Sequence, residues 1–483
     1  MQSLSEVALI ERPRLGAPFA PDPGSFRDRS NRVFLAANRV LRGLSAEAAC
    51  DWELLSRQVF FRELLQTGAI VGTRALDRGD PLCEAVPPQW RSLVLEHDRV
   101  PFISYPYEWT FSMLKDAALL QLHLLRSCLA HGWSMKDASA YNIQWRGARP
   151  VFIDVGSFEP AAEGEAWIGY RQFCMHFLIP LLLKAHRDID VAPLLRANLE
   201  GIAASEAIKF FPRWQRLKRG VLAHIAFPAA MEARIAKAER DAAPAKRRAI
   251  HHSQAMLLGL ATGLERTIKR LDIELEHTAW SHYENFNTYD AAALAEKKQF
   301  VERWVCRRHW PTVWDIGCNT GTFSRLCSSY SDLVVSIDSE HNAVEKLYRR
   351  EKEAGGSKIL PVVMDLANPS PGQGWNGAER KAFDGRTKPD LIVCLALVHH
   401  IVISANVPIS SFIQWLGRFN ACVIIEFVTR EDEMVQKLLM NKKEKHQDYD
   451  LESFAASLAA TFKVIDSKPL KGGRRQIFYL EPN

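Results

Sequence analysis

Two glycines and two aspartates within residues 313–338 have the types and spacing of a nucleoside-binding loop. Asp315 lies at the end of an apolar run, Gly317 and Gly321 follow it in a short loop, and Asp338 ends the next apolar run. Glycine has no Cβ atom, so the backbone can turn sharply and approach a ligand closely, and a carboxylate at a strand tip can accept hydrogen bonds from both ribose hydroxyls. These residues therefore predict an adenosine ligand bound by a βαβ unit.

Asn319 stands where dinucleotide-binding loops usually carry their middle glycine. A larger side chain at this position leaves less room for a pyrophosphate. We therefore expect a nucleoside ligand that carries no phosphates.

The pattern Asp315-x-Gly317-x-Asn319-x-Gly321 resembles motif I of the class I S-adenosylmethionine (SAM)-dependent methyltransferases, with Asp338 as the ribose-binding acid. Asp365, which follows the apolar residues 359–363, resembles the aspartate that binds the adenine amino group in this family. The resemblance covers residues 280–483. It implies SAM as the cofactor and an α/β, Rossmann-like fold of seven strands that closes with an antiparallel hairpin near residues 462–480.

Tyr283 and Tyr289 precede motif I. In similar methyltransferases such a segment folds over bound SAM, so the resemblance implies that both tyrosines contact the cofactor. A helix that packs between domains through its aromatic side chains would explain the two residues equally well.

His399 and His400 follow the predicted fourth strand (residues 390–397), at the sheet edge where ligands of α/β proteins bind. Methyl transfer displaces the sulfonium in line, so the protein must align the acceptor and remove its proton. Either histidine is a candidate general base, and Glu426, at the matching edge of the fifth strand, is a candidate to orient that histidine or bind the acceptor. Histidines that merely begin a helix are the alternative.

Missing motifs narrow the class of acceptor. The fourth strand is followed by neither Asp-Pro-Pro-Tyr nor Asn-Pro-Pro-Tyr, which argues against methylation of nucleobase amino groups. Cys394 follows valine rather than proline, which argues against methylation of cytosine at carbon 5. The histidine pair instead resembles that of small-molecule and O-methyltransferases. We therefore expect a hydroxyl on a small molecule, glycan or lipid-like acceptor, and nucleic acid is disfavoured.

A second constellation lies in the first half of the chain. Asp137 and Asn142 have the Asp-x-x-x-x-Asn spacing of a kinase catalytic loop, and Asp154 begins an Asp-x-Gly sequence after a short hairpin turning at Gly147. The region resembles the C-lobe of a kinase-like fold. That resemblance implies that Asp137 accepts a hydroxyl proton and that Asn142 and Asp154 hold magnesium, with Mg-ATP as a second ligand. No other metal site is predicted.

The kinase pattern is incomplete at its N-terminal side. Residues 1–114 contain no lysine, although kinases use a strand lysine to anchor the nucleotide phosphates. Arg39 or Arg42 is the nearest substitute, with Glu53 or Glu63 as its expected partner. The N-terminal domain is therefore expected to bind or present the acceptor, rather than to transfer phosphate.

Two other functions stay open. One is a bifunctional kinase and methyltransferase, and the other is a non-catalytic, ligand-sensing interaction protein. A kinase-like half followed by a methyltransferase half is similar to a bacterial family of predicted methyltransferases related to a rhizobial nodulation protein. This likeness implies a glycan, lipid or secondary metabolite as the acceptor.

The 483 residues are enough for two or three domains. We predict an α+β kinase-like domain (1–185), a helical connector (186–279) and the methyltransferase domain (280–483). The net charge of +6 neither requires nor excludes nucleic acid, and acids among the basic residues 213–248 favour a solvated helical surface. Nine cysteines without a Cys-x-x-Cys pair, and no apolar run long enough for a bilayer, indicate a cytoplasmic protein without membrane insertion. The oligomeric state is left open.

Overall fold

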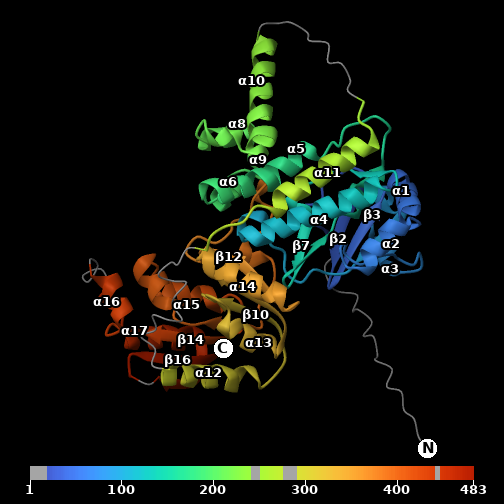
Figure 1. The fold of residues 1–483 in the computed structure, drawn as a ribbon. Coiled ribbons are helices and arrows are strands. Elements are labelled where there is room, and N and C mark those ends of the chain that lie inside the picture. Colours follow the sequence, from blue (N-terminus) through green and yellow to red (C-terminus); the bar gives the residue numbers. More distant parts are fainter. Residues whose placement is uncertain (1–18, 241–250, 276–290, 441–445, 471) are drawn as a thin grey trace, which may run out of the picture. The chain divides into compact units, whose positions relative to one another are not determined.

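The computed structural model describes residues 19–240, 251–275, 291–440, 446–470 and 472–483 (Figure 1). The chain divides into two compact units. Unit 1 ends at Arg99 and also includes Gln373–Arg380, and unit 2 consists of Val100–Gly372 and Lys381–Asn483. The domain boundaries expected at residues 185 and 279 stay predictions.

Unit 1 contains an antiparallel sheet with the strand order β1-β2-β3-β5-β4. Leu41 and Leu95 on its central strands are fully buried and belong to the core. Its strands are β1 (Phe19–Pro21), β2 (Asn31–Ala36), β3 (Arg39–Leu44), β4 (Thr73–Ala75) and β5 (Leu93–His97), and its helices are α1 (Ala46–Ser56), α2 (Val59–Gln66) and α3 (Pro81–Ala85).

Arg39, the expected substitute for the kinase lysine, makes different contacts from those predicted. Its guanidinium binds Glu96 at 2.6 Å and Asp80 at 3.0 Å, both within unit 1. Glu53 and Glu63, the expected partners, are exposed on α1 and α2. The pairing prediction was wrong because the neighbouring strand β5 supplies a carboxylate directly beside β3. A kinase-like fold for this half stays a prediction.

The first part of unit 2 is built on the long helix α4 (Phe111–Leu129), whose buried residues recur at helical spacing. The predicted hairpin is confirmed: β7 (Ile143–Arg146) and β8 (Arg149–Phe152) are joined at Gly147, which has a φ of +59°. Strands β6 (Trp133–Met135) and β9 (Phe158–Pro160) form a second pair. The main helices that follow are α6 (Ile179–Arg187), α7 (Ala192–Ala197), α8 (Ala204–Ala207), α9 (Arg219–Val221), α10 (Phe227–Arg240) and α11 (Gln254–Lys269).

The rest of unit 2 is the predicted seven-stranded sheet, which is confirmed with the order β12-β11-β10-β13-β14-β16-β15. Its first five strands are parallel, and the closing hairpin is antiparallel. The strands are β10 (Trp310–Ile316), β11 (Ser331–Asp338), β12 (Ile359–Val363), β13 (Leu391–Cys394), β14 (Cys422–Val428), β15 (Phe462–Pro469) and β16 (Arg475–Pro482). Helices α12 (Ala291–Val305), α13 (Thr322–Ser328), α14 (His341–Glu353), α15 (Ile409–Gly417), α16 (Glu433–Leu439) and α17 (Leu451–Thr461) lie between and around them (Figure 1).

Strand alternation assigns the polar side chains of this sheet to one face. Val313 and Ile424 pack in the same core cluster as Val301 and Trp304 of α12. Because side chains two residues apart on a strand share a face, Asp315 and Glu426 lie on the α12 side of the sheet. Two carboxylates from different strands are thereby placed under one helix.

No helix among the described residues is long and apolar enough to cross a membrane.

Candidate functional site

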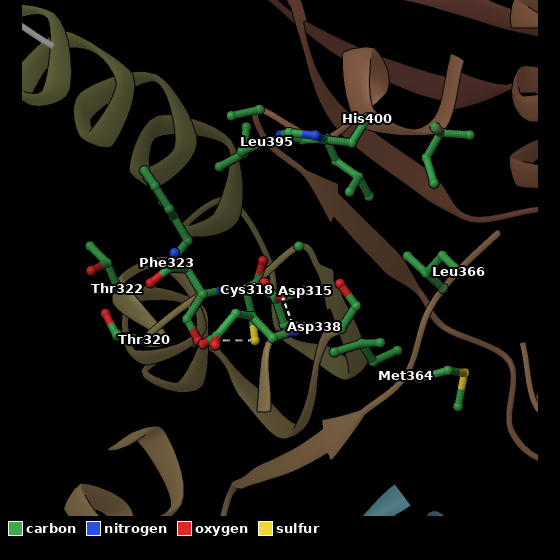
Figure 2. Close-up of a pocket in the computed structure, with 18 of the residues that line it drawn as sticks. Asp315, Cys318, Thr320, Thr322, Phe323, Asp338, Met364, Leu366, Leu395 and His400 are labelled. Carbon is green, nitrogen blue, oxygen red and sulfur yellow. Dashed lines mark hydrogen bonds between the residues drawn. The ribbon is translucent and has the colours of Figure 1, made fainter. Parts of the chain in front are cut away.

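A cavity of about 980 Å³ opens at the carboxyl ends of β10, β11, β12 and β13. This is the edge at which parallel α/β sheets bind ligands, because a crevice opens where the strand order reverses direction, here between β10 and β13. Figure 2 shows Asp315 and Asp338 on one side of the cavity and His400 across from them. Five of the predicted cofactor residues line it, namely Asp315, Gly317, Asn319, Asp338 and Asp365.

The loop after β10 takes the shape that its glycines predicted. Gly317, Asn319 and Gly321 all have positive φ angles, of 78°, 49° and 79°. A Cβ atom at Gly321 would collide with the Leu347 side chain, so this glycine is needed for close packing as well as for its φ. Gly321 itself is not among the residues that line the cavity.

Asp338 closes the loop onto the next strand. One carboxylate oxygen accepts a hydrogen bond from the Asn319 backbone N–H at 2.8 Å, and the other accepts from the Glu340 N–H at 2.9 Å. Burial raises the pKa of Asp338, although the backbone donors oppose this effect. Each oxygen retains a lone pair, so the fixed carboxylate can accept from a ligand diol as well.

Asp315 is fully enclosed at the floor of the cavity. The Ser324 hydroxyl donates to its carboxylate at 2.5 Å, and the Ser336 hydroxyl donates to Ser324 at 2.8 Å. Burial raises the pKa of Asp315 to about 6. Asp365 differs, because it is exposed at the rim after β12 and accepts from the Ala367 N–H at 2.9 Å.

Lys297 is a wall residue of the cavity that the sequence interpretation did not include among the site residues. Its side chain is only 4% exposed, and its Nζ lies 2.5 Å from a Glu426 carboxylate oxygen and 5.2 Å from the centre of the Phe323 ring. Burial lowers the pKa of Lys297, while the Glu426 charge opposes this effect. The sequence did hold a signal, since Lys297 interrupts a helical stripe formed by Ala293, Phe300, Val301 and Trp304.

Glu426 lies beneath the cavity wall instead of lining it. Besides Lys297, it approaches Arg475 at 3.4 Å, and Arg475 in turn binds Asp432 at 2.8 Å. These four side chains form a buried network of alternating charge across α12, β14, β16 and the N-cap of α16. The described contacts therefore connect Glu426 to the cavity through Lys297.

The two predicted histidines occupy different environments. His400 lines the cavity at the start of a π-helical turn, η11 (His400–Ser404), whereas His399 is completely buried behind it. Their rings lie 4.2 Å apart. Burial lowers the pKa of both imidazoles, and the cations Arg475 and Lys297 add to the effect at His399. Both rings are therefore neutral at pH 7, and of the two only His400 borders the cavity.

Backbone strain accompanies the histidine pair. Ala396, which lines the cavity between β13 and His400, has a φ of 51°, a value that costs energy for a residue with a Cβ atom. The π-helical turn after it is another uncommon conformation, and such turns occur often at functional sites. From this stretch Ala396, Leu397, His400, Ile401, Ser404 and Ala405 line the cavity.

Tyr283 and Tyr289 lie outside the described residues. Their predicted contact with the cofactor stays a prediction.

The kinase-like constellation is brought together in the first part of unit 2. Asp137 accepts a hydrogen bond from the Ser139 N–H at 2.8 Å, and burial together with the nearby charge of Asp154 raises the pKa of Asp137. The backbone carbonyl of Asn142 accepts a hydrogen bond from the Ile153 N–H at 2.9 Å, which fixes the loop beside Asp154. Among the described residues, no group of three or more His, Cys, Asp or Glu could hold a metal ion. Binding of Mg-ATP here stays a prediction.

Comparison with known proteins gives one extensive match in sequence. The nodulation protein NoeA of Rhizobium meliloti (strain 1021) is 33% identical over 470 residues, which cover 96% of this chain and 97% of that protein. No protein-family model matches the chain.

Solved structures match the chain over smaller parts. The N-methyltransferase NodS from Bradyrhizobium japonicum WM9 covers 40% of this chain and 98% of its own, with 12% identity and a TM-score of 0.31. The magnesium protoporphyrin IX methyltransferase ChlM from Synechocystis PCC 6803, solved with bound S-adenosylhomocysteine, covers 42% of this chain and 93% of its own, with 17% identity and a TM-score of 0.29.

Proposed function

The chain belongs to the family of the nodulation protein NoeA, and from this premise we propose that it is a SAM-dependent methyltransferase acting on a hydroxyl of a small-molecule, glycan or lipid-like acceptor. The observation that carries the proposal is the convergence of three carboxylates, Asp315, Asp338 and Asp365, from the tips of three successive strands on one cavity. A nucleoside with an amino-acid tail needs acceptors spaced in this way.

Asp338 is assigned to the ribose diol and Asp365 to the adenine amino group. Asp338 is held by two backbone N–H groups, so it is already oriented before a ligand arrives. Asp365 stands at the rim, where an adenine edge can reach it. The positive φ of Asn319 turns the loop backbone toward the same space.

Charge distinguishes SAM from a phosphorylated ligand. Four acids, Asp315, Asp338, Glu340 and Asp365, line the cavity against two lysines, one of which is paired with Glu426. A sulfonium and an ammonium group are favoured by such a lining, whereas a pyrophosphate would be repelled. We assign Lys297 to the carboxylate of the methionine tail, since it is the cation held in a fixed position at the wall.

His400 is assigned as the general base. It lines the cavity and burial keeps its imidazole neutral at pH 7, so the ring can take the hydroxyl proton while the acceptor oxygen bonds to the methyl carbon. The carbon–sulfur bond breaks in the same step and S-adenosylhomocysteine leaves. His399 and Glu426 are positioning residues in this scheme, His399 behind the base and Glu426 behind Lys297.

Calorimetry with S-adenosylhomocysteine tests the proposal. Asp338→Ala should weaken binding by about 30-fold, equivalent to roughly 2 kcal/mol, because the ribose hydroxyls would then be buried without their acceptor. Asp332→Ala is the matched control, since Asp332 lies on the same strand at its exposed opposite end. Equal affinity of wild type and Asp338→Ala would contradict the assignment of the cavity.

A further inference from the structure

The helical stretch that begins at Arg219 has a buried face and an exposed face, and both are apolar. It consists of α9, a π-helical turn (Leu222–Ala226) and α10. Val221, Ile225 and Ala229 are buried along one side. On the other side the exposed fractions of three large side chains are 46% for Leu222, 62% for Phe227 and 42% for Met231. A helix face that only meets water normally carries polar side chains.

The segment before this helix extends the exposed apolar surface. Trp214 and Leu217 are 68% and 72% exposed, and Phe210 is 37% exposed. Of the fourteen exposed large hydrophobic residues among those described, six fall within residues 210–231. Such a concentration is more than single hydrophobic residues scattered over a protein surface, and it marks an interaction site. We name this set the apolar ridge: Phe210, Trp214, Leu217, Leu222, Phe227 and Met231.

Positive charge surrounds the apolar ridge. Between residues 207 and 231 the chain carries five basic residues and no acidic one, the basic residues being Lys209, Arg213, Arg216, Lys218 and Arg219. Lys209, Arg213 and Arg219 are exposed and form no ion pair within the described part of the chain. The acids that flank this stretch are Glu206, which is exposed, and Glu232, which lies 3.7 Å from Arg171.

We propose that the apolar ridge and its basic residues form a docking surface for an anionic lipid bilayer. Tryptophan, phenylalanine and leucine enter the interface between headgroups and acyl chains, while lysine and arginine remain at the level of the anionic headgroups. This surface therefore matches both the anionic headgroups and the apolar region directly beneath them. Since no described helix can cross a bilayer, the association is peripheral.

Charge and apolar character favour an anionic membrane over two other partners, a second copy of the chain and nucleic acid. A second copy of the chain would bring five like charges against five, which opposes association through this face. Nucleic acid would satisfy the cations and could stack on the aromatic members of the ridge, but the exposed aliphatic side chains of Leu217, Leu222 and Met231 would stay without an apolar partner. An anionic membrane uses the basic and the apolar side chains together. The inference does not depend on the proposed methyl transfer.

Co-sedimentation of the full chain with vesicles tests the inference. Wild type should bind vesicles of phosphatidylcholine mixed with phosphatidylglycerol, and it should bind pure phosphatidylcholine at least ~10-fold more weakly. Added salt should weaken the binding because it screens the basic residues. Failure of wild type to bind the anionic vesicles, or equal binding to both kinds, would overturn the proposal.

Two variants separate the contributions of the surface. The triple variant Trp214→Ser, Leu217→Ser, Phe227→Ser and the double variant Arg213→Gln, Arg219→Gln should each reduce binding to anionic vesicles by ~10-fold or more. Trp375→Ser is the matched control, because Trp375 is 74% exposed in unit 1, and it should bind as wild type does. The double variant keeps the apolar residues, so the test holds even if the triple variant fails to fold.

Sedimentation velocity and RNA competition decide between the partners. A monomeric wild type whose vesicle binding persists in the presence of RNA supports the bilayer. A dimer that the triple variant abolishes, or vesicle binding that RNA removes at constant ionic strength, would assign the surface to a second copy or to nucleic acid and overturn the proposal.

Discussion

At the scale of single residues, the site contains two adjacent histidines that differ in access. His399 is enclosed, and neither of its ring nitrogens has a hydrogen-bond partner among the described residues. His400 borders the cavity. A buried, unpaired imidazole costs free energy of roughly 1–3 kcal/mol, so its side chain is retained for its shape or its position beside His400. The proposed role of general base is therefore assigned to His400, which borders the cavity.

Substitution of each histidine tests this division. With an acceptor that supports turnover, His400→Ala should lower the rate of S-adenosylhomocysteine release by about 100-fold and leave cofactor affinity nearly unchanged. His399→Leu should keep the rate and the stability, since it replaces two unpaired nitrogens by an apolar group of similar size. A folded His399→Leu protein as slow as His400→Ala would contradict the assignment.

The rate should also depend on pH in one direction. Burial places the pKa of His400 below its usual value of 6.5, so the neutral base predominates above that pH. The rate of methyl transfer should be flat above pH 6.5 and fall at lower pH as the imidazole is protonated. Initial rates measured across pH 5–8 at saturating SAM would check this expectation.

At the scale of elements, the sheet of unit 1 contains a titrating group at the junction of three strands. His97 on β5 pairs with β3 and with β4, accepts a hydrogen bond from the Arg42 Nε at 3.2 Å and lies 2.8 Å from the Thr73 hydroxyl. Burial first and the Arg42 charge second lower the pKa of His97 to about 3. The neutral ring is thus built into the strand pairing.

Acid should therefore destabilise unit 1. The unfolded state binds a proton at His97 below about pH 6.5, whereas the folded state binds it only near pH 3, so the free energy of unfolding falls as the pH decreases between these values, by on the order of 4 kcal/mol in total. His97→Gln can still accept from Arg42 but cannot titrate. Urea unfolding from pH 7 to 4 should show a smaller pH dependence for this variant, and an unchanged dependence would contradict the role of His97.

At the scale of the molecule, a buried ion pair within unit 2 joins its first part to the seven-stranded sheet. Arg386 contacts both carboxylate oxygens of Glu108, at 2.7 and 2.8 Å, and neither side chain is more than 1% exposed. Ser370 also donates to Glu108, at 2.5 Å. Helices α4 and α14 add a second connection, because the Tyr348 hydroxyl donates to Asp116 at 2.5 Å.

Removal of one member of the Glu108–Arg386 ion pair should lower the stability of the protein. Arg386→Met leaves the Glu108 carboxylate buried without its counter-charge, and we expect a loss of about 3–5 kcal/mol in the free energy of unfolding. The double variant Glu108→Gln, Arg386→Met should recover part of this loss, because no charge stays buried. Denaturant unfolding of the two variants measures the difference, and equal stabilities would show that the unpaired charge is not the cause.

Much of the candidate site could be predicted from the sequence because each of its acids lies at or just after the end of an apolar run. Parallel strands point the same way, so their carboxyl ends meet at one edge, and Asp315, Asp338 and Asp365 converge whatever the details of packing. The seven strands and the closing hairpin were expected from the resemblance to the methyltransferase family, and the structure confirms them. The acids at the strand ends follow from local pattern, which a single sequence contains.

Other features were decided only by the tertiary structure. Lys297 and Glu426 are 129 positions apart, and Glu108 and Arg386 are 278 apart, so no local pattern pairs them. Periodicity shows that a side chain faces a core, but the partner there depends on which distant segment packs against it. For the same reason, the sequence could not show that His399 is buried while His400 borders the cavity, or that the apolar ridge is exposed. Burial depends on the packing around a side chain, which forms only when the whole chain folds.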